Sequence, residues 1–163
     1  MKLPQIIPQK IYDLPGLLQQ VNRWRILGKT IAFTNGCFDI LHQGHIASLS
    51  DAAREADILI VGLNSDTSAR RLKGPGRPVN DQHARAIVMA SLLMVDAVTL
   101  FDEDTPLDLI NAIRPDVLVK GGDYTLEQIV GAKELMSWGG RVVINPIVPG
   151  FSTTAILEKI SKL

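Results

Sequence analysis

The sequence predicts an α/β fold, a doubly wound sheet of five parallel strands with helices on both faces. Five short runs rich in Val, Ile and Leu lack the polar alternation of half-exposed strands, which is typical of strands buried on both faces. Segments with helical spacing of apolar residues lie between these runs, and this alternation of strand and helix favours a parallel sheet. The length of 163 residues suits one domain, for which ~100–200 residues are usual.

The first 28 residues are predicted to precede the sheet. Residues 1–12 contain two prolines and are expected to be extended. Asp13 can cap a helix that runs to about Leu27, and Gly28 suits the end of that helix. The strands are expected at 30–34, 57–63, 96–101, 116–120 and 141–147. We therefore expect one domain over 1–163, in which 29–163 form a Rossmann-like core.

Helices are expected between and after these strands. One runs from Ile46 to Glu55, and a second carries its apolar face at 84–92. Thr105 to Asp108 has the pattern of a capping box with proline at the first helical position. Thr125 with Gln128 forms a second capping box. The last helix should start near Thr153 and bury three apolar side chains, those of Ile156, Ile160 and Leu163.

Composition excludes several classes of protein. The chain has 17 basic and 17 acidic residues, so it offers no broad charge for nucleic acid or an anionic membrane. No apolar run approaches the ~20 residues of a membrane span, and no signal peptide is apparent at the N-terminus. The single cysteine, Cys37, excludes an internal disulfide and fits a reducing cytoplasm.

The stretch Thr34 to His45 is the strongest functional signal. It leads from the end of the first strand through glycine into a helix, so it should direct backbone N–H groups and a positive helix end at one point. Such a point suits a phosphate group. We interpret His42 and His45, three residues apart, as contacts to the α-phosphate of a nucleoside triphosphate. The residues expected to bind the nucleotide before them are Thr34, Asn35, Gly36, Cys37 and Phe38.

Other interpretations of this stretch stay open on spacing alone. The histidines could cap a helix or lie in the core, or they could bind zinc, although His83 has no cysteine or paired carboxylate near it. Asn35-Gly36 could be a hairpin turn, but no alternating return strand follows. Cys37 could be a nucleophile, but no base can be assigned to it.

Six ordered motifs identify the chain as resembling a known superfamily. The motifs are Gly36-Cys37-Phe38-Asp39 with His42-Gln43-Gly44-His45, Asn64-Ser65-Asp66, Arg71-Leu72-Lys73-Gly74, Arg77-Pro78-Val79-Asn80, Lys120-Gly121-Gly122-Asp123-Tyr124 and Ser152-Thr153-Thr154. Together they resemble the HxGH nucleotidyltransferases related to cytidylyltransferases, and within them the adenylyltransferases that form ADP-heptose. The likeness covers the chain from about Lys10 onward.

The resemblance implies transfer of AMP from ATP to D-glycero-β-D-manno-heptose 1-phosphate, with release of pyrophosphate. The ADP-heptose would supply a bacterial lipopolysaccharide core. Mg²⁺ would travel on the triphosphate without direct protein ligands, and the protein would be a homo-oligomer, dimeric or larger. Since no kinase-like segment precedes residue 1, a separate enzyme is expected to supply the sugar phosphate.

The resemblance also assigns residues beyond the first loop. The lysine of the family's phosphate-binding loop corresponds to Lys73, which a glycine-rich flap could close over the triphosphate. Arg85 matches a family arginine that either binds phosphate or braces the flap. Asp39 could fix its loop through backbone N–H groups or contact substrate or phosphate, and the family leaves a metal-linked role open for it.

Two later segments complete the predicted site. Gly121 allows close approach of a base or ribose, Asp123 could accept from ribose hydroxyls, and Lys120 is a candidate phosphate contact. Ser152 and Thr153 open the last helix, where they could cap it and also bind the leaving pyrophosphate. In a parallel sheet, segments 35–45, 120–124 and 148–154 all follow strands, so we expect them at one edge of the sheet. Ligands bind beyond that edge in open α/β folds.

Alternative functions remain. The nearest is cytidylyl transfer to glycerol 3-phosphate or another phosphorylated acceptor, but that branch has an arginine and a glutamate where this chain has Val148-Pro149-Gly150-Phe151. A nucleotide-binding module without catalysis is a further alternative, against which the histidine pair and Lys73 speak. A redox Rossmann domain is disfavoured because GxGxxG does not follow the first strand.

Overall fold

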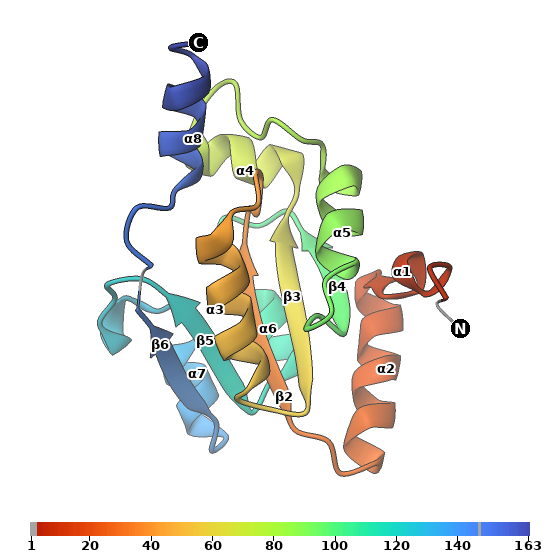
Figure 1. The fold of residues 1–163 in the computed structure, drawn as a ribbon. Coiled ribbons are helices and arrows are strands. Elements are labelled where there is room, and N and C mark those ends of the chain that lie inside the picture. Colours follow the sequence, from red (N-terminus) through yellow and green to blue (C-terminus); the bar gives the residue numbers. More distant parts are fainter. Residues whose placement is uncertain (1–2, 147) are drawn as a thin grey trace.

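A computed structural model describes residues 3–146 and 148–163 and contains a six-stranded, fully parallel sheet (Figure 1). Across the sheet the strands lie in the order β1-β4-β3-β2-β5-β6. Their bounds are β1 Ile11–Tyr12, β2 Ile31–Gly36, β3 Ile58–Asn64, β4 Ala97–Phe101, β5 Val117–Gly121 and β6 Arg141–Asn145. From β2 the chain builds outward to β3 and β4, then returns to β5 on the other side of β2. The α/β class is confirmed, with one strand more than the five expected.

The sheet separates two apolar layers, because successive side chains of a strand point to opposite faces. In β2, Ile31 and Phe33 belong to one buried cluster and Ala32 to the other. The first cluster includes Leu17 of the helix at Leu14–Ile26 and residues of α6 (Leu107–Ile113) and α7 (Ala132–Ser137). The second cluster includes residues of α3 (Gln43–Ala53) and α5 (Gln82–Ala90), which cover the face toward the viewer in Figure 1. Helices therefore cover both faces, as the buried strands predicted.

The helices lie between and after the strands along the chain. Their bounds are α1 Ile6–Gln9, α2 Leu14–Ile26, α3 Gln43–Ala53, α4 Asp66–Lys73, α5 Gln82–Ala90, α6 Leu107–Ile113, α7 Ala132–Ser137 and α8 Thr153–Ile160, with a 3₁₀ turn η1 at Leu126–Gln128. The helix predicted from Ile46 starts three residues earlier, at Gln43. In the described part of the chain, no helix has the length and apolar character needed to cross a bilayer.

The expectation of an extended lead-in over 1–12 is wrong for the described residues, which form α1 and the edge strand β1. Pro8 is tolerated in α1 because the first N–H groups of a helix have no intrahelical partner. The backbone of Lys10 accepts from Val98 at 2.8 Å, and its ammonium donates to Val95 O at 2.7 Å. These bonds attach the lead-in to β4. The following helix is confirmed, with Asp13 accepting from Gly16 N at 2.8 Å.

Three further expectations change near the C-terminal half. The capping box at Thr105 is not formed, since α6 is preceded by Pro106 without a side-chain cap. The strand expected to reach 147 ends at Asn145, and residue 147 itself lies outside the described residues. The last helix does begin at Thr153, but Ile160 is 57% exposed and Leu163 fully exposed, so the expected burial of these two side chains is wrong. The capping box of Thr125 and Gln128 is confirmed.

The packing of α2 predicts that this helix is an integral part of the core. Leu17→Ala should lower the free energy of unfolding by about 2–5 kcal/mol, because Leu17 is fully buried and its truncation leaves a cavity. The matched control is Ile26→Ala on the same helix, where the side chain is 85% exposed and the change should stay within about 0.5 kcal/mol. Urea unfolding of both variants checks this. Equal effects would show that α2 does not pack as described.

Candidate active site at the carboxyl edge of the sheet

The site lies where the direction of chain progression across the sheet reverses, between β2 and β5. A cavity of about 160 Å³ is lined by three segments that are far apart in sequence. Its lining residues are His42, Gly44, His45, Ser48, Gly121, Pro146, Val148 and Phe151. The loop after β2, the end of β5 and the segment before α8 therefore meet at one edge. The predicted convergence of these segments is confirmed.

The two histidines form a stacked pair at the start of α3. Their ring centroids are 3.8 Å apart with an interplanar angle of 21°. Phe38 contacts His45 edge-on at 5.3 Å, and Phe151 lies parallel to His42 at 6.4 Å. Gly44 lets the His42 ring lie close to the helix start, because a Cβ there would lie 3.1 Å from the ring and would require it to shift. His42 occupies the N-cap position without a side-chain capping bond, so helix capping does not explain the imidazole.

Burial keeps both imidazoles neutral at pH 7. It lowers the pKa of His45 from 6.5 to about 4, with a further contribution from the charge of His42. Burial also lowers the pKa of His42. Between pH 6.5 and about 4 the folded state binds fewer protons at His45 than the unfolded state, so His45 reduces stability as the pH falls through this range.

Each imidazole of the pair has one buried nitrogen without a hydrogen-bond partner. The Nδ1 atoms of His42 and His45 are buried and make no hydrogen bond within the described residues. Unsatisfied buried polar atoms are rare in proteins and concentrate at functional sites. His42 and His45 lie at the N-terminus of α3, an 11-residue helix whose dipole is positive at this end. The pair is therefore suited to an anion with several acceptor oxygens.

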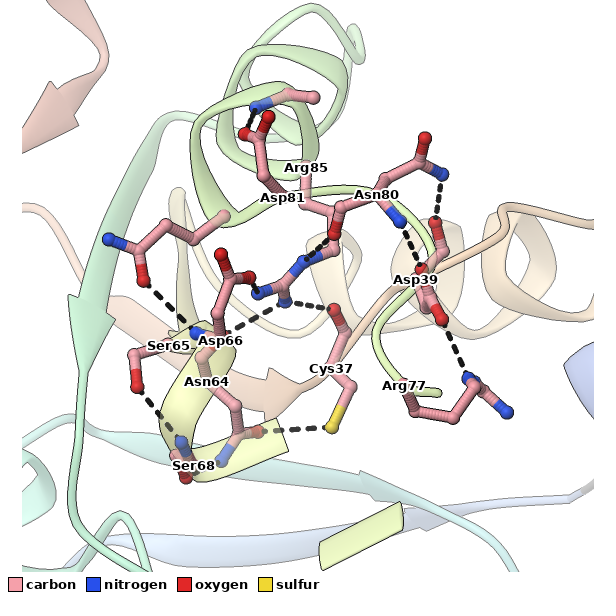
Figure 2. A network of polar contacts seen from close by, with 12 residues as sticks. Cys37, Asp39, Asn64, Ser65, Asp66, Ser68, Arg77, Asn80, Asp81 and Arg85 are labelled. Carbon is pink, nitrogen blue, oxygen red and sulfur yellow. Dashed lines mark hydrogen bonds and ion pairs between the residues drawn. The ribbon is translucent and has the colours of Figure 1, made fainter. Parts of the chain in front are cut away.

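Asp39 holds the loop that carries residues 77–80 (Figure 2). Its carboxylate accepts from Arg77 Nε at 2.7 Å, Val79 N at 2.9 Å and Asn80 N at 3.0 Å. Burial alone would raise the pKa of Asp39, but the N–H groups of Asn80 and Val79 and the Arg77 guanidinium outweigh it and lower the pKa. The carboxylate is thus occupied by the loop. We assign Asp39 to positioning, in place of the predicted contact to substrate or phosphate.

Arg85 is buried among the ends of two strands, with only 1% of its surface exposed (Figure 2). Its Nη1 donates to the carbonyls of Cys37 at 2.6 Å and Asn64 at 2.9 Å. Its Nε donates to Asn80 O at 3.0 Å and its Nη2 to Asp66 Oδ1 at 2.7 Å. Of the two roles that the sequence left open, the geometry favours the brace over the phosphate contact.

The residues from the end of β2 to Phe38 have mainly structural partners. Thr34 and Asn35 are in β2, and the Asn35 Oδ1 accepts from Lys120 Nζ at 3.3 Å. A Cβ on Gly36 would lie 3.0 Å from the Phe38 ring, and Phe38 itself has a positive φ of 43°. This strained turn aims the Phe38 ring at His45.

Cys37 is unsuited to nucleophilic chemistry. Burial raises the pKa of its thiol, which therefore stays protonated near neutral pH. Its Sγ lies 3.8 Å from Asn64 Oδ1. Cys37 lines a cavity, and its predicted contact with the nucleotide stays a prediction.

The remaining predicted residues divide between two places. Ser152 caps α8 by accepting from Ala155 N at 3.0 Å, and Thr153 donates to Ile40 O at 3.4 Å, so this helix start lies against the histidine loop. Gly121 lines the histidine cavity, while Asp123, two residues further along the chain, is exposed. Lys73 and Lys120 line a second cavity of about 360 Å³.

One segment was missed although the same rule could have found it. Residues 102–106 also follow a strand, and Asp104 and Thr105 line the second cavity together with Asn64 of a named motif. Phe151 was named only as part of a departure from a family motif, yet it lies over His42. Within residues 3–146 and 148–163, no group of three or more His, Cys, Asp or Glu side chains could hold a metal ion, which disfavours the zinc interpretation.

Comparison with protein families gives a match over most of the sheet. The family described as cytidylyltransferase-like matches residues 33–159. Two curated relatives are both named Bifunctional protein HldE. The one from Methylobacillus flagellatus is 55% identical over 152 residues, covering 93% of this chain and 31% of its own length. The one from Hyphomonas neptunium is 57% identical over 149 residues, covering 91% and 31%. The chain thus spans about a third of these relatives.

Two solved structures share the fold. A lipopolysaccharide core biosynthesis protein from Thermoplasma volcanium has a TM-score of 0.60 and 27% identity, covering 74% of this chain and 98% of its own. A pantoate-beta-alanine ligase from Francisella tularensis, complexed with beta-gamma ATP and beta-alanine, also has a TM-score of 0.60. It is 18% identical and covers 94% of this chain and 78% of its own, a likeness that concerns the fold alone.

The neutral state of the histidine pair gives a titration prediction. In the free protein, NMR titration should give His45 a pKa of about 4. Inorganic triphosphate should raise this pKa, because a nearby anion favours the imidazolium form. The resonances of the exposed His83 should not respond to triphosphate. A His45 pKa that is unchanged at saturating triphosphate would mean that the anion binds elsewhere.

The Asp39 contacts predict a local effect on the loop at 77–80. Asp39→Ala should accelerate hydrogen exchange of the Val79 and Asn80 amides by about tenfold or more, because each loses a bond to a charged acceptor, worth ~1.5–3 kcal/mol. The Ala84 amide, which Asp81 caps at 2.8 Å, serves as an internal control and should exchange at its original rate. Unchanged exchange at 79 and 80 would refute the positioning role.

Proposed function

This chain belongs to the cytidylyltransferase-like family, and we propose that it transfers AMP from ATP to D-glycero-β-D-manno-heptose 1-phosphate. The observation that carries the proposal is the stacked, neutral pair of His42 and His45 at the start of α3, with unpartnered Nδ1 atoms. The relatives of about 55% identity and the likeness to a lipopolysaccharide core biosynthesis protein support this acceptor. The order of the six sequence motifs supports ATP as the donor.

The proposed reaction is an in-line displacement at the α-phosphorus of ATP. An oxygen of the sugar phosphate forms a new bond to that phosphorus while the bond to the bridging oxygen of the β-phosphate breaks. The bonding electron pair leaves with pyrophosphate. No proton has to be removed from the acceptor, since its phosphate is already an anion, and catalysis then depends on positioning and charge stabilisation.

The imidazoles would donate hydrogen bonds to the α-phosphate oxygens as their negative charge grows. Because the pair is held by Phe38, Phe151 and its own stacking, these donors need no reorganisation during the reaction. An approaching anion would also favour protonation of the imidazoles and so strengthen these bonds.

Other residues would hold the remainder of the nucleotide. Gly121 lines the histidine cavity and could allow close approach of the ribose or base. Asp123, two residues further along the chain and exposed, would accept from the ribose hydroxyls. The Ser152–Thr153 start of α8 would face the leaving pyrophosphate, and its positive helix end suits that charge. Lys73, at the end of α4, would neutralise charge from the opposite side.

Mg²⁺ belongs to the substrate in this proposal, bound by the triphosphate oxygens and shielding their charge. The described residues offer no cluster of ligands for it, and each contact above comes from groups of the chain itself. The ATP substrate and the single half-buried cysteine both suit a reducing cytoplasm. Self-association as a dimer or larger homo-oligomer stays a prediction.

The principal alternative is transfer of CMP from CTP to glycerol 3-phosphate. The loop Val148–Phe151 lacks the arginine and glutamate of that branch and instead supplies Phe151, which contacts His42 through its ring. A non-catalytic nucleotide-binding module would not need paired imidazoles with unsatisfied nitrogens, since these lower stability without a reactive partner.

Turnover experiments test the proposed donor and acceptor. Purified protein should release pyrophosphate from ATP in the presence of the heptose 1-phosphate and Mg²⁺, and much more slowly from CTP with glycerol 3-phosphate. Turnover of CTP without turnover of ATP would contradict the proposed activity.

The histidines can be tested separately from folding. His42→Ala and His45→Ala should each lower kcat by about 100- to 1,000-fold, the range for loss of one donor to a developing charge. The matched control, His83→Ala, changes an exposed histidine on α5 and should retain full activity. A site variant that keeps both its urea midpoint and its kcat would show that the imidazole it lacks has no part in the reaction.

A further inference from the structure

Helix α8 (Thr153–Ile160) lies outside both apolar layers of the fold. It has no buried residue, and neither apolar cluster includes one of its side chains among the buried or the partly buried members. It lies at the end of the molecule toward which the strands point (Figure 1). Among the described residues, the one side-chain hydrogen bond that joins α8 to another segment is donated by Thr153 to Ile40 O at 3.4 Å. The fold itself therefore gives this helix little support.

A helix of eight residues needs packing to be stable in water. Isolated helices shorter than ~12–15 residues are marginally stable, and helices in proteins depend on an apolar face that packs. Ile156, Ile160 and Leu163 follow at intervals of four and three residues, the spacing of one helical face. The helical turn continues past α8, since Leu163 N donates to Ile160 O at 3.1 Å. Ile160 is 57% exposed and Leu163 fully exposed, so the outer part of this face is open to solvent.

The charged side chains beside this face are complementary to those of a second copy. Glu158 and Lys162 make no ion pair within residues 3–146 and 148–163. If two copies of α8 lie antiparallel with their Ile160 side chains at a two-fold axis, each residue faces the one equally far from Ile160 on the other copy. Glu158 of each copy then faces Lys162 of the other, which gives two pairs of opposite charge. Lys159 faces Ser161, so no like charges meet.

The antiparallel arrangement also covers the apolar residues. Leu163 of each copy comes beside Ile156 and Leu157 of the other, on either side of the axis. A parallel arrangement would instead place Glu158 against Glu158 and Lys162 against Lys162, and like charges repel. The apolar and the charged residues of α8 therefore favour the same two-fold geometry.

We propose that α8 packs antiparallel against α8 of a second copy of this chain, with the two-fold axis at Ile160. The same surface serves on both copies, as an isologous interface requires. The contact also affects the active site, because Ser152 caps α8 by accepting from Ala155 N at 3.0 Å and Thr153 begins the helix. Fixing α8 fixes these two residues beside the histidine loop. This consequence rests on the proposed function, whereas the association itself does not.

Analytical ultracentrifugation of a concentration series tests the interface. The wild-type protein should form a dimer, and Ile160→Asp should weaken its association by about tenfold or more, because it places two carboxylates at an apolar contact. The matched control Ile26→Asp changes an apolar residue of α2 that is 85% exposed and should leave the dimer intact. A wild-type protein that stays monomeric at all concentrations, or an equal effect of the two substitutions, would overturn the proposal.

Mixing two charge variants separates the interface from the stability of the helix. Glu158→Lys and Lys162→Glu should each weaken self-association by about tenfold, because each homodimer then has two pairs of like charges. An equal mixture of both variants should associate about as strongly as the wild type, since the lysines of one variant face the glutamates of the other. Mixing cannot reverse a defect within a single helix. A mixture that associates no better than the separate variants would contradict the antiparallel contact.

Turnover at decreasing protein concentration tests the link to the active site. The rate of pyrophosphate release per molecule should fall severalfold as the wild-type dimer dissociates, and Ile160→Asp should show the lower rate throughout. A rate per molecule that stays constant through dissociation would show that the start of α8 needs no second copy. Because association is measured without substrates, a protein that dimerises through α8 but does not turn over ATP would refute the proposed function and leave the interface in place.

Discussion

The buried guanidinium of Arg85 is the interaction on which the rest of the site depends. A buried charge is expensive unless it is fully hydrogen-bonded, and Arg85 meets this condition with three carbonyls and the Asp66 carboxylate. Its partners lie just after β2, at the end of β3, at the start of α4 and just before α5. Asp39 adds a second set of bonds to the neighbouring loop. The loops that surround the site are therefore held in place by charged groups that are bonded to other parts of the protein, which is the preorganisation that electrostatic catalysis requires.

The histidine pair depends on that rigidity. Two imidazoles with centroids 3.8 Å apart would repel each other if both were charged, and burial also favours the neutral forms. Their unpartnered Nδ1 atoms reduce stability in the free protein. An anion at the N-terminus of α3 would relieve both penalties, since it accepts the available hydrogen bonds and favours protonation. Packing against Phe38 and Phe151 holds the rings in place until then.

The sequence was most informative where one physical rule acted alone. Buried parallel strands are continuous apolar runs, so five strands and their order along the chain were predictable. The edge strand β1 was not, because two residues pair with β4 through backbone atoms and leave no pattern. Ile160 and Leu163 at helical spacing suggested burial, but no core lies beneath them. Within the site, motifs located the residues but could not distinguish bracing from binding. Whether the charged groups of Arg85 and Asp39 brace loops or bind a ligand depends on the tertiary contacts around them, which the motifs do not show.

The central claim is that the imidazoles of His42 and His45 contact the α-phosphate of the donor. The most direct measurement is a crystal structure of the protein with α,β-methylene ATP, whose α–β bond cannot be cleaved. We predict imidazole nitrogens within hydrogen-bond distance, ~2.7–3.2 Å, of α-phosphate oxygens, with the triphosphate extending toward the start of α8. A bound nucleotide whose α-phosphate lies beyond the reach of both imidazoles would contradict the account.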